Sequence, residues 1–411
     1  MALAIEAVRN SARSSQRPRS RSALKSLELF TGAGGLALGT HAAGFKHVAL
    51  AEWNRDACET LRANVAGRTL NGIAQWRVFQ TDVRALNFAR FGSVDLVAGG
   101  PPCQPFSIGG KHRGTDDERN MIGEFIRAVG ALAPRAFILE NVRGLLRPTF
   151  TDYFRYVRLA LTYPTVAPLP EEEWAGHLAR LQAAQDQGWA GTPRYDVTYR
   201  LVNAADYGVP QTRARVFLVG FRTDLGVSYR FPYPTHSQEE LWRSQWLTGD
   251  YWAEHGLPRP DDCPLTPAQL ARLSTLPFPP RKRWRTTRDA IGDLPAPSAD
   301  RDVPSVLNHR LIPGARSYPG HTGSDLDLPA KTLKAGGHGV PGGENMIARR
   351  DGTVRYLTVR EAARLQTFPD AWRFEGAWGE IMRQLGNAVP MDLAYLVARS
   401  VAEQLVASDG R

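Results

Sequence analysis

The fold of this chain is decided by a stretch near its start, Leu27-Glu28-Leu29-Phe30-Thr31-Gly32-Ala33-Gly34-Gly35-Leu36. An apolar run followed by closely spaced glycines predicts a strand that enters a tight turn and then a helix, which we expect to extend to about Gly44. Glycines in such a turn let the backbone approach a ligand, and the amides that start the helix face an anionic group. The spacing departs from G-x-G-x-x-G, which disfavours a nicotinamide dinucleotide.

Two more strands are expected after this turn. Residues 48–51 lead into Glu52 and Trp53, and residues 77–79 lead to Asp82. An acid at the end of the second strand is placed to accept hydrogen bonds from ribose hydroxyls, and Asp82 is placed to accept one from an adenine amino group. Trp53 either covers the face of an adenine or lines the core.

A lone cysteine follows the next apolar run, where residues 94–100 lead into Pro101-Pro102-Cys103-Gln104-Pro105. The pattern predicts a buried strand that stops at the edge of the sheet and presents Cys103 on a stiff loop. A cysteine in that place is positioned to act as a nucleophile. The alternative, a small buried apolar residue, is the usual fate of a free cysteine.

Charged residues lie at the ends of two later strands. Ala136-Phe137-Ile138-Leu139 delivers Glu140 to the carboxyl edge of the sheet, and a carboxylate after four apolar residues is costly to bury without a partner. Gln211-Thr212-Arg213-Ala214-Arg215 leads into a strand at residues 216–220. Its alternate arginines are typical either of a functional site or of a solvated ion-pair face.

Composition favours a polyanionic partner. The chain has 411 residues, a net charge of +10 and a pI of about 9.7. Half of this charge lies in the first 25 residues, and we expect residues 1–24 to be a disordered basic tail, a flexible arm that adds nonspecific affinity for such a partner. An organellar transit peptide is the alternative for this Arg- and Ser-rich tail.

The cysteine content excludes a disulfide framework. Three cysteines, Cys58, Cys103 and Cys263, are too few and too scattered for a disulfide set or a zinc site, so we expect a reducing compartment and no metal. No apolar stretch has the ~20 residues of a membrane span.

Strand-like and helix-like segments alternate from Leu24 to about Leu161, which predicts an α/β fold with a doubly wound parallel sheet. Residues 164–191 break this rhythm and are interpreted as a surface insertion with its own helix. Residues 197–202 and 215–221 are expected to close the sheet as an antiparallel pair. From Phe231 the composition shifts to Pro, Trp and Arg with little helical periodicity until Val359, which indicates a second, smaller, irregular domain.

Six motifs in order resemble the cytosine-5 DNA methyltransferase family. They are F-x-G-x-G-G (30–35), P-C-Q (102–104), E-N-V (140–142), Q-x-R-x-R (211–215), R-E-x-x-R-L-Q-x-F-P (360–369) and G-N-A-V-P (386–390). The resemblance implies a Rossmann-like, S-adenosylmethionine-dependent methyltransferase fold of the bacterial restriction-modification type. It implies a catalytic domain over 25–222, a target-recognition domain over 223–370, and a return to the catalytic domain over 371–411, with the helix at 391–398 beside the first glycine turn.

The resemblance also implies a mechanism. The Cys103 thiolate would attack carbon 6 of a cytosine swung out of duplex DNA, so that carbon 5 can accept a methyl group. Glu140 would hydrogen-bond ring nitrogen 3 and the exocyclic amine. Arg215 would hold the carbonyl oxygen at carbon 2, with Arg213 and Gln211 shaping that wall. The sequence does not identify the base that removes the proton from carbon 5, and water is one option.

Two further sets of residues follow from the family motifs. The cofactor S-adenosylmethionine is expected to contact Phe30, Thr31, Gly32, Gly34, Gly35, Leu36, Glu52, Trp53, Asp82, Val83, Pro101, Asn387, Ala388 and Val389. The DNA is expected to contact Ser107, Lys111, Arg119, Arg281, Lys282, Arg283 and Thr332. For the basic run at 281–285, a solvated basic loop is the alternative.

These expectations describe a monomeric enzyme of the bacterial cytoplasm that acts on double-stranded DNA, with a cognate restriction endonuclease acting separately. One alternative is a tRNA cytosine-5 methyltransferase, against which the long recognition region argues. A catalytically inactive DNA-binding relative is disfavoured because Cys103, Glu140 and Arg215 are all present. A nicotinamide oxidoreductase is a further alternative, which is disfavoured because Pro-Cys-Gln has no role in such an enzyme.

Overall fold

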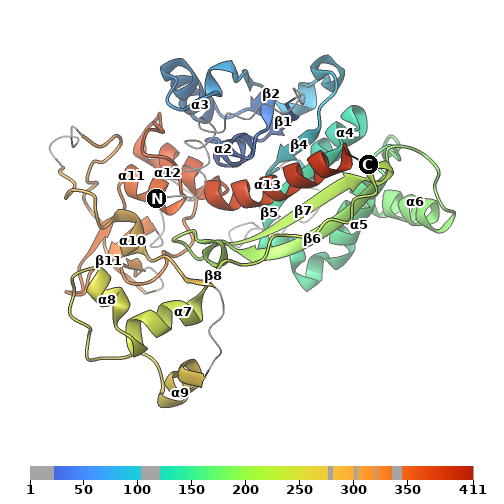
Figure 1. The fold of residues 1–411 in the computed structure, drawn as a ribbon. Coiled ribbons are helices and arrows are strands. Elements are labelled where there is room, and N and C mark those ends of the chain that lie inside the picture. Colours follow the sequence, from blue (N-terminus) through green and yellow to red (C-terminus); the bar gives the residue numbers. More distant parts are fainter. Residues whose placement is uncertain are drawn as a thin grey trace.

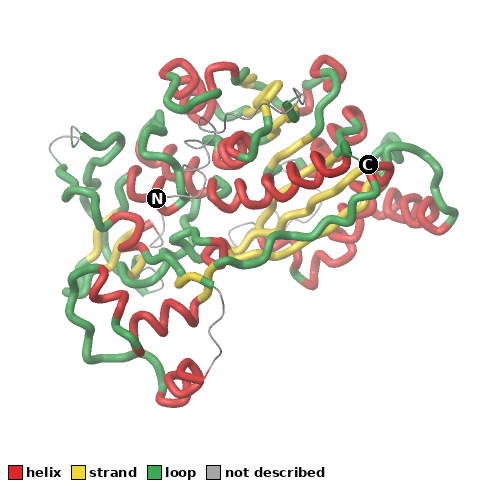
Figure 2. Tube along the Cα trace, in the orientation of Figure 1, coloured by secondary structure: helices red, strands yellow, loops and turns green. Residues whose placement is uncertain are grey.

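The computed structural model describes residues 23–102, 121–275, 281–299, 303, 305–319, 322–335 and 345–410. A seven-stranded mixed sheet in the order β3-β2-β1-β4-β5-β7-β6 forms its centre (Figures 1 and 2). The strands are β1 Lys25–Leu29, β2 Lys46–Glu52, β3 Val78–Gln80, β4 Leu96–Gly99, β5 Ala136–Val142, β6 Tyr195–Asn203 and β7 Ala214–Arg222. β1 to β5 are parallel, and β7 is antiparallel to both β5 and β6. The predicted doubly wound α/β sheet and its antiparallel closing pair are confirmed.

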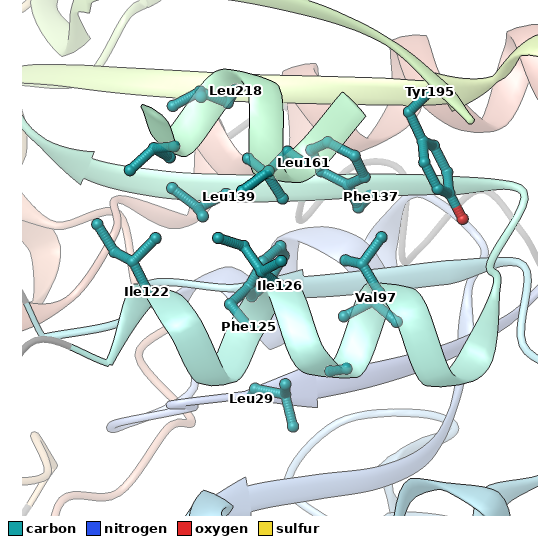
Figure 3. Packing of buried hydrophobic residues seen from close by; sticks show 14 of the residues in the cluster. Leu29, Val97, Ile122, Phe125, Ile126, Phe137, Leu139, Leu161, Tyr195 and Leu218 are labelled. Carbon is teal, nitrogen blue, oxygen red and sulfur yellow. The ribbon is translucent and has the colours of Figure 1, made fainter. Parts of the chain in front are cut away.

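Helices cover both faces of the sheet. The helices are α2 Gly35–Ala42, α3 Arg55–Gly67, α4 Ile122–Leu132, α5 Thr151–Thr162 and α13 Met391–Ser408. Leu29, Val97, Phe125, Phe137 and Leu139 belong to the buried cluster in which α4 and α5 pack on one face (Figure 3). On the other face α13 lies beside α2 and extends across the sheet (Figure 1).

The expected insertion contains a helix of its own. α6, Trp174–Asp186, packs against α5, and Glu172 and Arg180 form an ion pair of 2.7 Å that ties the preceding loop to α6. In Figure 1, α6 lies at the end of the molecule opposite α8 and α9.

The stretch after Phe231 is more helical than predicted. Its elements are β8 His236–Ser237, α7 Gln238–Trp242, the π-helix η10 Arg243–Leu247, α8 Asp250–Glu254, α9 Pro267–Thr275, β9 Lys282–Arg283, α10 Thr287–Ile291, β10 Ser324–Asp325, β11 Met346–Ala348 and β12 Val354–Tyr356. These helices are too short to produce the periodicity that a window of about 11–18 residues reveals. Capping residues mark the starts of such helices instead, as in the capping box that Thr286 and Asp289 form at the start of α10.

Two further helices join this region to the sheet. α11 Val359–Leu365 and α12 Trp378–Asn387 share a buried cluster with Ala37 of α2 and Leu61 of α3. The same cluster includes Ala330 and Leu333, so the chain rejoins the core of the sheet domain before α11.

Candidate active site at the carboxyl edge of the sheet

Strand register brings the predicted site residues to one edge. Leu29 of β1 pairs with both Ala51 and Gly99, and Leu139 pairs with Gly99. The residues that follow these positions therefore leave the sheet at the same level. This places the glycine turn, Glu52, Pro101 and Glu140 along one edge, where open parallel sheets bind ligands.

The glycine turn is tight and leaves space beside it. Gly32 and Gly34 have φ angles of +55° and +94°, and the Gly34 amide donates to the Thr31 carbonyl at 3.0 Å. A Cβ added at Gly32 would meet no atom within 4 Å. Glycine is required there for the backbone angle, and the open space beside it is available to a ligand.

Glu52 is anchored by the backbone. Its Oε2 accepts from the Gly32 amide at 2.7 Å, and its Oε1 accepts from the amides of Trp53 and Asn54 at 2.9 and 2.7 Å. Burial raises the pKa of this carboxyl, and the three amides oppose the rise. Trp53 is 71% exposed, which rules out the alternative that it lines the core.

Asp82 has a partner that the sequence did not suggest. Its carboxylate accepts from the Arg84 amide at 2.9 Å and from the Arg84 guanidinium at 2.6 Å, and this lowers its pKa. Val83 is buried, and its carbonyl accepts from Arg127 at 2.8 Å. Any contact that Asp82 makes with a ligand must therefore be shared with Arg84.

The turn between α12 and α13 packs directly on the glycine turn. A Cβ added at Gly35 would lie 2.2 Å from the Val389 carbonyl oxygen. Leu36, Ala388 and Val389 are buried, whereas Asn387 is exposed. The predicted return of the final helix to the first glycine turn is thus present in the structure.

Glu140 and Arg215 form a buried ion pair. Arg215 Nε lies 2.8 Å from Glu140 Oε1, and the two side chains are 11% and 8% exposed. Burial raises the pKa of Glu140, while Arg215 and Arg213 oppose the rise. A Cβ at Gly100 would lie 3.0 Å from Glu140 Oε2, so the carboxylate faces the backbone that leads into Pro101.

Asn141 has a role that sequence reasoning missed. Its side-chain amide donates to the Pro101 carbonyl at 3.2 Å, and its oxygen accepts from the Val142 amide at 2.9 Å. Asn141 therefore fixes the start of the Pro-Pro-Cys segment relative to Glu140. Its position directly after Glu140 was the available signal, but an asparagine at a strand end has many alternative partners.

Arg213 and Gln211 are structural anchors in this arrangement. The Arg213 guanidinium is fully buried and donates to the backbone carbonyls of Leu333, Gly386 and Ala388. Gln211 donates to the Leu365 carbonyl at 3.2 Å and accepts from the Leu333 amide at 3.0 Å. These contacts join the 330–335 segment, α11 and the α12–α13 turn. That both side chains also shape the wall of the substrate site stays a prediction.

The expected DNA contacts divide into three groups. Arg281 and Lys282 are exposed. Arg283 and Thr332 instead have partners within the protein. Arg283 forms ion pairs with Asp289 at 2.6 Å and with Glu254 at 2.9 Å, which neutralise its charge. The Thr332 hydroxyl donates to the Thr212 carbonyl at 2.6 Å. The expectations for Cys103, Ser107, Lys111 and Arg119 concern positions outside the described residues.

The described residues contain neither a cluster suited to a metal ion nor a helix suited to span a membrane. No group of three or more His, Cys, Asp and Glu side chains in that part of the chain is arranged to hold a metal ion. None of the described helices combines the length and apolar character that a bilayer crossing requires.

Sequence comparisons relate the chain to one family model and to individual methyltransferases. The chain matches the family model of the C-5 cytosine-specific DNA methylases over residues 24–161 and 190–403, and the unmatched interval falls on the insertion that contains α6. It is 33% identical over 382 residues to the Type II methyltransferase M.NgoMIV of Neisseria gonorrhoeae, covering 92% of this chain and 97% of the relative. It is 32% identical over 391 residues to M.PspPI of Psychrobacter sp., covering 93% and 80%.

Solved structures share the fold. A putative DNA modification methyltransferase from an E. coli prophage aligns with a TM-score of 0.57 and 21% identity, covering 93% of this chain and 99% of the other. The S. pombe Dnmt2 methyltransferase aligns with a TM-score of 0.53 and 16% identity, with the same coverage. At these identities the likeness concerns the fold alone.

Proposed function

The chain belongs to the C-5 cytosine-specific DNA methylase family and is a DNA cytosine-5-methyltransferase, and on this premise we propose that it methylates a flipped cytosine in duplex DNA through a covalent adduct with Cys103. The observation that carries the proposal is the buried Glu140–Arg215 pair, which faces the backbone at Gly100 three residues before Cys103. A buried carboxylate beside a nucleophile segment is suited to hydrogen-bond the polar edge of a ring.

S-adenosylmethionine is the proposed methyl donor. The residues fit it because the space beside Gly32 is open, Glu52 is anchored by three amides and Trp53 is exposed at the adjoining strand end. When bound, this cofactor supplies an electrophilic methyl group. Glu52 would hold its ribose, and Trp53 would cover its adenine.

The protein's own residues would carry the remaining chemistry. The Cys103 sulfur forms a bond to carbon 6, and the electron pair of the 5,6 double bond moves to carbon 5. Glu140, whose pKa is raised by burial, holds a proton at ring nitrogen 3 and accepts from the exocyclic amine. After carbon 5 is methylated, loss of its proton restores the double bond and releases the Cys103 thiolate.

Recognition of the DNA sequence is assigned to residues 223–370. Supporting this division, Leu241, Tyr251 and Trp252 form a small buried cluster separate from those of the sheet. By analogy with its Type II relatives, we assign the enzyme to a restriction-modification system in the bacterial cytoplasm, with an endonuclease acting separately.

Bisulfite sequencing of DNA from a host that expresses this chain tests the proposal. We expect 5-methylcytosine at one defined sequence and its absence from the host that lacks the chain. In parallel, purified protein should transfer labelled methyl groups to duplex DNA and not to tRNA. Preferential labelling of tRNA would replace the DNA assignment, and labelling of neither would indicate an inactive relative.

A further inference from the structure

Four exposed residues lie near the place where the sheet domain joins the recognition region. This junction surface consists of Arg200 on β6, Tyr233 in the connecting segment, and Arg281 and Lys282 at β9. We propose that it binds the sugar–phosphate backbone of duplex DNA beside the target cytosine. The inference rests on the proposed function, and it adds Arg200 and Tyr233 to the phosphate contacts expected of Arg281 and Lys282.

Strand register places the surface close to the catalytic carboxylate. Glu140 of β5 pairs with Phe217 of β7, and Phe217 pairs with Arg200 of β6. Glu140 and Arg200 therefore lie in one row, two strands apart, and at about 4.8 Å per strand their backbones are roughly 10 Å apart. Paired residues of neighbouring strands project to the same face, so Arg200 is on the side of the sheet that Glu140 occupies.

Tyr233 is held rigidly although its side chain is free. It is 77% exposed and lies between Pro232 and Pro234. The Pro232 carbonyl accepts from Tyr207 at 3.1 Å and from Arg200 at 3.5 Å. Prolines restrict the backbone on both sides, so little backbone entropy remains to be lost when the ring meets a partner.

Thr235, two residues after Tyr233, connects the sheet domain to the recognition region. The Thr235 amide donates to the Asp206 carbonyl at 2.9 Å, and the Thr235 carbonyl accepts from the Lys282 amide at 2.9 Å. Arg200 from the sheet and Lys282 from the recognition region are thereby held around the same short segment. Their arrangement is a product of the tertiary fold, because 82 residues separate them in the chain.

The cations of this surface have only weak partners: Arg281 interacts electrostatically with Asp206, and the Arg200 guanidinium lies 5.6 Å from the centre of the Phe231 ring. Within the described part of the chain, no acidic group lies at ion-pair distance from Arg200, Arg281 or Lys282. The acids nearby are Asp206, whose oxygen accepts from Trp284 at 3.0 Å, and Glu239. Unpaired cations beside an exposed tyrosine suit a phosphate backbone, since Arg, Lys and Tyr all donate to phosphate oxygens.

Duplex binding measured over a range of salt concentrations tests the proposal. Lys282→Gln should reduce the slope of log affinity against log salt by about 0.9, the value for one phosphate contact. Tyr233→Phe, which keeps the ring and removes the hydroxyl, should weaken binding by about tenfold, as the loss of one hydrogen bond to a charged group does. Both effects should appear in KM for DNA and not in the affinity for S-adenosylmethionine.

Lys46→Gln is the matched control, because Lys46 is exposed at the start of β2, on the opposite edge of the sheet. Lys282→Gln and Tyr233→Phe could both show the DNA affinity and salt dependence of Lys46→Gln while the wild type binds and methylates duplex DNA. In that case the junction surface does not bind the DNA backbone, and the proposed function stands. If the wild type neither binds nor methylates duplex DNA, the proposed function itself fails. The Lys282 side chain is exposed, so its substitution tests the surface without threatening the fold.

Discussion

Arg215 on β7 reaches across to Glu140 on β5, and the two buried side chains form an ion pair of 2.8 Å. The pair lies at the carboxyl edge of the sheet, where Asn141 also fixes the Pro101 backbone. A buried charge pair of this kind is costly to break, since removing one partner leaves the other uncompensated. The predictions below begin from this pair.

Arg215→Gln should lower the single-turnover rate of methyl transfer by roughly 100-fold or more, because one stabilising donor and one positive charge are lost from the site. Arg215 opposes the burial that raises the pKa of Glu140, so its removal raises this pKa further. If protonated Glu140 is the active form, the alkaline limb of the pH–rate profile should move to higher pH. Arg399→Gln, in an exposed pair on α13, is the control and should leave the profile in place.

Cys103→Ser should abolish methyl transfer and retain binding of DNA and S-adenosylmethionine, since a serine hydroxyl is far less nucleophilic than a thiolate. With 5-fluorocytosine in the target site, the wild-type enzyme should accumulate a covalent protein–DNA complex, detectable by mass spectrometry as a peptide adduct at Cys103. The serine variant should form none. Wild-type activity in that variant would exclude the adduct mechanism.

Glu52→Ala should weaken S-adenosylmethionine binding, measured by calorimetry, by at least about tenfold, as expected when hydrogen bonds to a charged group are lost. The variant also removes the acceptor that holds the Gly32 amide, so the glycine turn loses an anchor. Glu52→Gln, which keeps one oxygen acceptor, should lose less. The control is Glu59→Gln on the exposed face of α3, and an unchanged affinity in Glu52→Ala would remove Glu52 from the cofactor site.

Gly35→Ala should destabilise the protein by roughly 1–3 kcal/mol or more, because its methyl group would lie 2.2 Å from the Val389 carbonyl oxygen. The turn that carries Asn387 would have to move, so cofactor affinity should fall as well. Gly123→Ala in α4 is the matched control, since a Cβ there meets nothing within 4 Å. Denaturant unfolding should separate the two variants, and equal stability would contradict the close packing.

Glu28, which is fully buried in β1, should make the stability of the protein depend on pH. Burial raises its pKa from 4.5 to about 8, with Thr40 acting in the opposite direction. The native state therefore holds this proton when the unfolded state has lost it, so Glu28 should make stability decrease as pH rises from about 4.5 to 8. Glu28→Gln cannot ionise, and urea unfolding across this range should show a smaller decrease than in the wild type. Equal slopes in the two proteins would show that Glu28 does not titrate in this range.

The central sheet, and the edge of it that carries the site, could be predicted from the sequence. Buried parallel strands are continuous apolar runs, and each such run here ends at a chemically distinctive residue, as at Glu52 and Glu140. The carboxyl ends of parallel strands meet at the same edge of a sheet. Motifs that directly follow these strands in the sequence could therefore be expected to lie together at that edge. The short helices α7 to α10 escaped prediction because each has between five and nine residues, fewer than the window in which helical periodicity is recognised.

The contacts of each polar side chain, in contrast, depend on the assembled fold. From the sequence, Arg213 and Arg215 lie beside a predicted strand and Arg283 lies in a basic run, yet Arg213 binds backbone carbonyls, Arg215 pairs with Glu140 and Arg283 pairs with Asp289. Arg213 and its acceptor Ala388 are 175 residues apart in the chain. Periodicity and propensity are properties of neighbouring residues, whereas the partner of a long side chain is set by which distant segment packs against it, and that is fixed only when the whole core assembles.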